Sequence, residues 1–218
     1  MRTNLLPLAR TIAASALIAT GLLLAALGSQ ARASAAAESF VQSNVQRGLQ
    51  ILNTPSLSWE QRRAQFRQFL IGLTDLRRIA LYTLGPARRT STQAEQDQFV
   101  ESFKEYAFAV YGAEFEKYSG QTLKITGSIE RAPGDELVRT VLIDPHAPKG
   151  QEPIEVDFRV YGSDGKYSVV DIVVAGLDLA ITEQDDFSSF LAQHGGSVRA
   201  LIQNLRQRAA RVRATGQI

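Results

Sequence analysis

The chain contains no cysteine and only two histidines among its 218 residues. Without cysteine it cannot form a disulfide, present a thiol nucleophile or be lipidated at a cysteine, so its stability must come from packing. His146 lies in a proline-rich loop, and His194 precedes two glycines that end a helix. Two isolated histidines also leave a zinc site without its usual ligands. We therefore expect no metal and no cofactor.

The usual catalytic motifs are missing as well. The sequence has no Gly-x-Ser-x-Gly nucleophile motif and no glycine-rich phosphate loop of Walker or Rossmann spacing. Asp171 interrupts the apolar run 169–174, so it lies either on an outer face or at a buried edge where it is hydrogen-bonded. We expect no catalytic residues. An α+β enzyme with a cone-shaped fold that uses Asp171 for proton transfer in a pocket is the alternative.

Residues 1–33 have the pattern of an export signal. Arg2 and Arg10 are basic, residues 11–27 are apolar or small, and Ala31-Arg32-Ala33 is a small-x-small cleavage site. The apolar run is shorter than the roughly 20 residues that a membrane-spanning helix needs. We predict a signal peptide over 1–33 and an exported domain over 34–218. With no cysteine to be lipidated, that domain would be free in the periplasm.

Removing the predicted signal changes the charge balance. The segment holds three of the 24 basic residues and none of the 22 acidic ones, so 21 basic residues remain against 22 acidic. A near-neutral chain lacks the excess of Lys and Arg that nucleic-acid binding needs. Five arginines do gather in 199–213. They predict a solvated helix face, with a contact to anionic lipid or an acidic partner as the alternative.

The first half of the exported part is predicted to be helical. Apolar residues recur at helical spacing from Val41 to Leu52, and capping boxes at Ser58 and Thr92 begin two further helices. A short helix between them begins at Thr74 and ends at Gly85-Pro86, and the longest helix runs from Thr92 to about Tyr118.

After Gly120 the apolar period changes from 3.6 to 2. Four alternating segments follow within 123–174, and their short connections predict antiparallel pairing. Two more helices follow, with caps expected at Thr182 and Ser197. The predicted class is α+β: a curved four-stranded antiparallel sheet covered on one face by helices, with a helical N-terminal half and two C-terminal helices.

The order of these segments resembles the MlaC family, also called the toluene-tolerance family, from about Phe40 to Leu205. The resemblance rests on the Leu84-Gly85 stop, the 92–118 helix ending in Tyr-Ser-Gly-Gln, Val141-x-Ile143-Asp144-Pro145, Val156-x-Phe158-x-Val160 and the run 169–176. It implies a periplasmic phospholipid carrier that shuttles lipid between an outer-membrane complex and the lipid-binding domain of an inner-membrane ABC transporter. This chain has Tyr167 and Ala175-Gly176-Leu177-Asp178 where the family commonly has Trp and Glu-Gly-Val-Ser, so a hopanoid-associated carrier of the same family is the alternative.

Such a carrier needs a hollow interior. Exposing two acyl chains of about 30 methylenes to water costs on the order of 20 kcal/mol, so the protein must enclose them. We expect the headgroup to stay at the mouth of this cavity. A plain filled core is the alternative for the aromatic residues of 99–118. The side chains that we expect to line a lipid cavity are Tyr82, Leu84, Phe103, Tyr106, Val141, Phe158, Val160, Ile172 and Val174.

Overall fold

The structure, a computed structural model, describes residues 35–217. The predicted signal peptide and its cleavage site lie outside these residues. The N-terminal helix is described over 35–52. The other helices are α2 (Trp59–Leu73), α3 (Leu76–Thr83), α4 (Gln93–Glu116), α5 (Leu179–Gln193) and α6 (Val198–Thr215), with a short 3-10 helix at Gly85–Arg89.

The strands form one antiparallel sheet in the order β1-β2-β3-β4-β5. Four match the predicted segments, and the fifth was not predicted: it is a two-residue strand that pairs with the end of β4. The β3–β4 hairpin turns at Asp164-Gly165, both at positive φ, which suits a two-residue turn. The strand bounds are β1 (Thr122–Ala132), β2 (Asp135–Ile143), β3 (Ile154–Ser163), β4 (Lys166–Val174) and β5 (Leu177–Asp178).

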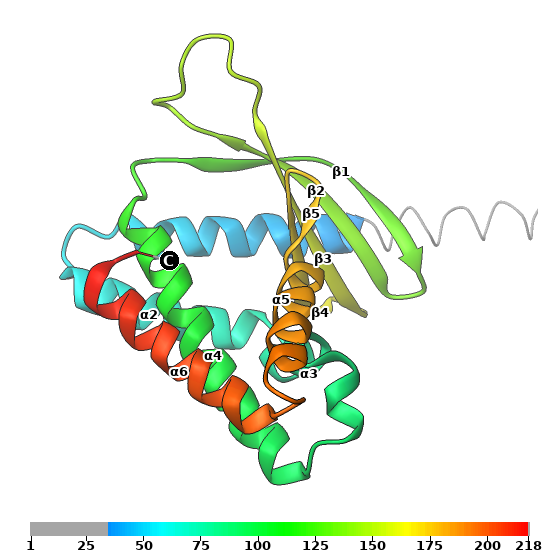
Figure 1. The fold of residues 1–218 in the computed structure, drawn as a ribbon. Coiled ribbons are helices and arrows are strands. Elements are labelled where there is room, and N and C mark those ends of the chain that lie inside the picture. The colour runs from blue at the N-terminus through cyan, green and yellow to red at the C-terminus, as the bar shows by residue number, and fades with distance from the viewer. Residues whose placement is uncertain (1–34, 218) are drawn as a thin grey trace, which may run out of the picture.

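The helices cover one face of this sheet (Figure 1). The N-terminal helix lies along the sheet, where its Ala37 and Val41 pack against Val138 and Val160. Helices α4 and α6 lie side by side, and α3 and α5 contact β4. The predicted α+β class is confirmed, with five strands in place of four.

Local hydrogen bonds explain where the helices begin. The capping boxes at Ser58 and Thr92 are both formed. Two predicted N-caps, Thr74 for α3 and Thr182 for α5, are wrong. Asp75 caps α3, because the Thr74 hydroxyl donates to Leu70 O and so closes α2. Asp178 caps α5, and the Thr182 hydroxyl donates to the carbonyl of that same residue from within the helix.

The interior is divided between the helices and the sheet. The largest apolar cluster, called here the helical core, joins α3, α4, α5 and α6, and it includes Phe99, Phe187 and Leu205, none more than 1 % exposed. A second cluster joins the N-terminal helix to the sheet, and a third joins that helix to α2 through Leu52, Phe66 and Phe69.

Candidate functional site: an apolar cavity under the sheet

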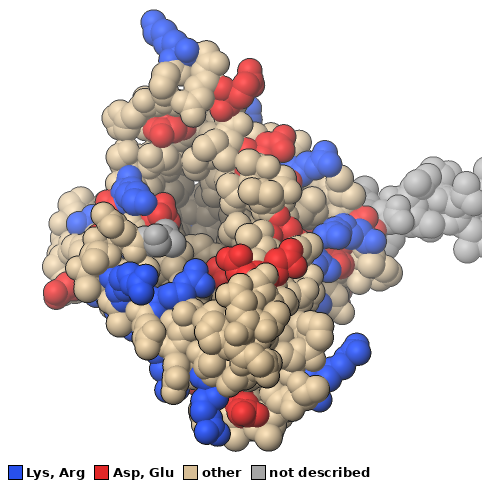
Figure 2. All heavy atoms as spheres, in the orientation of Figure 1, with Lys and Arg blue, Asp and Glu red and all other residues tan. Residues whose placement is uncertain are grey.

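A cavity of about 370 Å³ lies between the sheet and the helices that cover it. In the same region Figure 2 shows a surface hollowed between the sheet and the helical layer. Of the lining side chains, only those of Asn44, Thr74 and Tyr111 carry a polar atom. The Asn44 amide donates to Phe40 O and the Thr74 hydroxyl to Leu70 O, so both are satisfied by their own helices. The interior is therefore suited to hydrocarbon and offers little to a polar solute.

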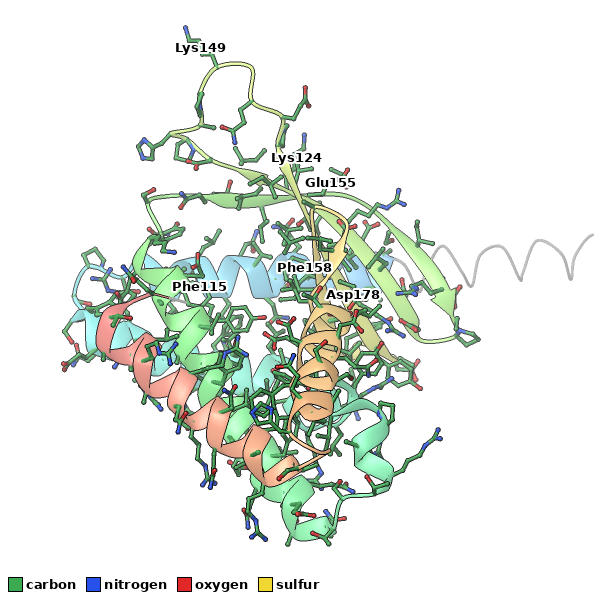
Figure 3. All side chains as sticks on the ribbon, viewed as in Figure 1. Phe115, Lys124, Lys149, Glu155, Phe158 and Asp178 are labelled. Atoms are coloured by element: carbon green, nitrogen blue, oxygen red, sulfur yellow. The ribbon has the colours of Figure 1, made fainter. Side chains whose placement is uncertain are left out.

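Strand alternation decides which side chains of the sheet face the cavity. Val156 and Phe158 of β3 lie opposite Val174 and Ile172 of β4, and these four side chains point to the helix side. Figure 3 shows Phe158 on that side and Lys124 and Glu155 on the other. Because the side-chain period of a strand is two, Phe158 and its apolar neighbours face the cavity, and Lys124 and Glu155 lie on the opposite face.

The N-terminal helix, α2 and α4 provide most of the opposite wall. Their contributions are apolar positions spaced three or four residues apart, as expected for helices that bury one stripe. These residues are Phe40, Val41, Val45, Leu49, Leu52, Phe66, Phe69, Leu70, Leu73, Ala107, Phe108, Tyr111 and Phe115.

Three of the nine expected lining residues, Phe158, Ile172 and Val174, line this cavity. Val160 is fully buried in the cluster that closes the sheet against the N-terminal helix. Val141 lies on the outer face, because it pairs with Lys124 on one side and Glu155 on the other.

The other four expected residues belong to the helical layer. Leu84, Phe103 and Tyr106 are buried in the helical core, and Tyr82 is 45 % exposed on α3. Phe103 packs against Phe187 of α5 and Tyr106 against Arg208 of α6, whereas Phe108 and Phe115 of the same helix α4 line the cavity.

Most of the cavity residues that sequence reasoning missed belong to helix stripes, and Leu123, Val156 and Val169 belong to strands. Val45, Phe69 and Leu73 fall on regular apolar periods, which predicted helices but not what those helices enclose. A stripe that lines a cavity and a stripe that fills a core have the same spacing. The two are distinguished only by how closely other helices and strands pack against the stripe in the tertiary structure.

A small, mainly apolar pocket of about 80 Å³ that contains two carboxyl groups adjoins the cavity between α3, α4, α5 and β4. We call it the acidic niche, after its Asp171 and Glu183. Asp171 is 6 % exposed and accepts hydrogen bonds from the backbone N–H groups of Ile172 and Ala180. It therefore lies at a buried, hydrogen-bonded edge, the second of the two predicted settings. Burial, and then a hydrogen bond with the Asp178 carboxyl, raise the pKa of Asp171 to about 6.

Glu183 lies in a short chain of hydrogen bonds across the helices. Arg208 donates to the Tyr106 hydroxyl at 2.6 Å, and that hydroxyl donates to Glu183 Oε1 at 3.3 Å. Burial raises the pKa of Glu183, and Arg208 partly offsets this. The chain links α6, α4 and α5, so these polar groups help to hold the helical layer together.

Within residues 35–217 there is no group of three or more His, Cys, Asp or Glu placed to hold a metal ion. The same part of the chain has no helix with the length and apolar character needed to cross a membrane.

An antiparallel sheet with a helical layer over an apolar cavity defines an α+β protein with an internal ligand chamber. The family model "MlaC protein" matches residues 42–207, and the chain belongs to this family. Among solved structures, the chain is similar to the phospholipid-binding protein from Ralstonia solanacearum in complex with a phospholipid. The TM-score is 0.67 at 25 % sequence identity, over 83 % of this chain and 98 % of that one.

Proposed function

We propose that the protein is a periplasmic carrier that binds a phospholipid, or a related lipid such as a hopanoid, and that its acyl or hydrocarbon part occupies the cavity under the sheet. The observation that carries this proposal is the 370 Å³ interior, whose few polar side chains largely bond to their own helices. Membership of the MlaC family and the phospholipid complex of the Ralstonia protein support it.

The carrier binds without performing chemistry. Asp171 is the candidate for a catalytic acid, and its carboxylate is already engaged by two backbone N–H groups and by Asp178. These bonds tie the start of α5 to β4. A structural role accounts for the burial of Asp171.

In this proposal the protein is exported by the segment 1–33 and lacks a cysteine at which it could be anchored. It would collect lipid at one membrane and release it at the other, as the soluble component of an ABC-type transport system. Its partners would be an outer-membrane lipid-transfer complex and the lipid-binding domain of the inner-membrane transporter.

The test is to fill the cavity. Val45→Trp adds a large ring to a side chain that lines the cavity, and Gln46→Trp adds the same ring to an exposed position of the same helix. Native mass spectrometry of protein purified without detergent should show bound lipid in the unaltered protein and in Gln46→Trp, with at least a tenfold loss in Val45→Trp. Lipid-free unaltered protein that takes up no lipid from vesicles would exclude the carrier function.

A further inference from the structure

A second open pocket, of about 190 Å³, lies between α2, α4 and the end of α6. We call it the arginine pocket, because Arg63, Arg67 and Arg213 line it together with Trp59 and Glu116. Unlike the cavity, it combines charged side chains with an apolar floor. That combination suits the junction between the chains and the headgroup of an amphiphile.

The arginine pocket and the cavity are separated by a single layer of side chains. Six residues line both spaces, and within this wall the rings of Phe66 and Phe115 have centroids 3.9 Å apart. The six are Leu52, Phe66, Leu70, Phe108, Tyr111 and Phe115. An amphiphile could therefore reach both spaces if these two rings turned aside.

The charges of the arginine pocket are only partly compensated. Arg67 and Arg213 share the carboxylate of Glu105, at 2.5 and 2.8 Å. Glu116 accepts a hydrogen bond from the Trp59 indole N–H. Arg63 has no hydrogen bond, ion pair or ring contact with any residue of the described chain. Three guanidinium groups thus face two carboxylates, and the excess charge is positive.

The stem of the Arg63 side chain lies against α4. It passes Gly112, where an added Cβ would lie 3.7 Å from Arg63 Cδ and meet nothing else within 4 Å. Gly112 is not among the positive-φ glycines, so its backbone conformation does not require this residue. The pocket wall beside the Arg63 stem is therefore uncrowded.

The acidic niche gives the contrast. It adjoins the cavity through Ala107, Tyr111, Ile172 and Leu179, but its ionisable lining groups are the Asp171 and Glu183 carboxyls and the Tyr106 and Tyr111 hydroxyls. A phosphate there would meet like charge. Of these two pockets, only the arginine pocket offers the forked donors that suit phosphate oxygens. A third pocket, lined by Arg47 and Arg67, shares only Phe69 with the cavity.

We propose that the arginine pocket binds the phosphate group of the lipid whose chains occupy the cavity, with Arg63, Arg67 and Arg213 as its donors. This rests on the proposed carrier function and makes it specific for an amphiphile with an anionic phosphate. The Phe66 and Phe115 rings turn aside to let the glycerol end pass.

The test compares two lipids with identical chains, dioleoyl phosphatidate and dioleoylglycerol, bound to the full exported protein. We expect the phosphatidate to bind about tenfold more tightly, because only its phosphate can accept charge-assisted hydrogen bonds from the guanidinium groups. The double variant Arg63→Gln/Arg213→Gln should lose this preference and keep its affinity for dioleoylglycerol. Arg211→Gln is the matched control, because Arg211 is exposed on α6 and lines no described pocket.

Three results would overturn the phosphate site. The double variant could keep the preference, Arg211→Gln could reduce it equally, or inorganic phosphate alone could displace phosphatidate and so mark a site for the free ion. Failure of every variant and of the unaltered protein to bind dioleoylglycerol would instead contradict the carrier function itself. An unchanged melting temperature in the double variant shows that any loss of preference does not come from unfolding.

Discussion

Helix α4 borders two interiors that are built from the same kinds of residue and differ in how they are filled. Its Phe99 and Phe103 meet Phe187 of α5 edge-on in the helical core, where the adjoining acidic niche measures only about 80 Å³. Its Phe108 and Phe115 lie on the neighbouring stripe and face the open cavity. Large apolar side chains therefore do not by themselves make a solid core, because the elements across from them must come close enough to fill the space.

The two interiors should differ most in the loss of stability that follows when an aromatic ring is removed. Phe99→Ala in the helical core should lower the free energy of unfolding by about 3–5 kcal/mol, since the closed surroundings leave a void. Phe158→Ala should cost less than half as much, because its side chain already borders empty space. Urea denaturation of both variants measures this. Equal losses would show that the cavity is as tightly packed as the helical core.

Adding a larger side chain should also destabilise the helical core more than the cavity. Leu205→Trp places a larger side chain at a fully buried position of the helical core and should destabilise by about 1–3 kcal/mol. Leu73→Trp places the same ring at the cavity wall, where there is room for it. It should leave the melting temperature of lipid-free protein nearly unchanged. A comparable loss at Leu73 would contradict a hollow interior.

A third prediction concerns the boundary between the two interiors, where Asp171 ties β4 to α5. Its pKa of about 6 lies above its ordinary value of 3.8, so the folded protein holds this proton more tightly than the unfolded chain does. The stabilisation is complete below about pH 4 and is lost as the pH rises through about 6. Asp171→Asn should remove this dependence of the free energy of unfolding on pH, which we expect to be on the order of 1 kcal/mol between pH 4 and 7.

Chemical denaturation at several pH values between 4 and 7 would show the effect. Asp157→Asn, on the neighbouring strand β3, is the control. An unchanged slope in Asp171→Asn would mean that this carboxyl does not carry the proton.

The smallest effect should come from the helix caps. Thr92→Ala removes the cap of α4 and should lower global stability by about 1 kcal/mol. Ser58→Ala removes the equivalent cap of α2, which covers the cavity. We expect it mainly to raise amide hydrogen exchange within α2, because a wall beside empty space opens locally more easily than one in a closed core. Equal exchange in both helices would argue against this.

Much of the fold follows from local patterns in the sequence. The change of apolar period at Gly120, the Asp164-Gly165 turn and the two capping boxes each act over a few residues, and all correspond to observed elements. The cap of α5 was missed because Asp178 and Thr182 are both plausible N-caps. Only the pairing of Asp178 with Val173 in the sheet decides between them.

The site was less predictable, because which side chains point into the cavity depends on elements that are distant in sequence. Val141 looks like any inward strand residue until the register places it between Lys124 and Glu155. Tyr106 and Phe108 are two residues apart on one apolar helix, and only the position of α6 assigns the first to the helical core and leaves the second at the cavity. The spacing of apolar residues identifies which face of a helix is buried, but it does not identify the element that packs against that face.

The strictly sequential strand order has a consequence for how the chain folds. Successive strands of the sheet are neighbours in sequence, so the sheet can grow hairpin by hairpin without first closing a long-range contact. The helical core depends instead on α6 reaching α4, as in the Arg206–Ser102 bond between residues 104 positions apart. The sheet can therefore form while α4 still exposes its aromatic stripe to water. The step most open to aggregation is then the late docking of the last helix, the stage at which a chaperone would have most to protect.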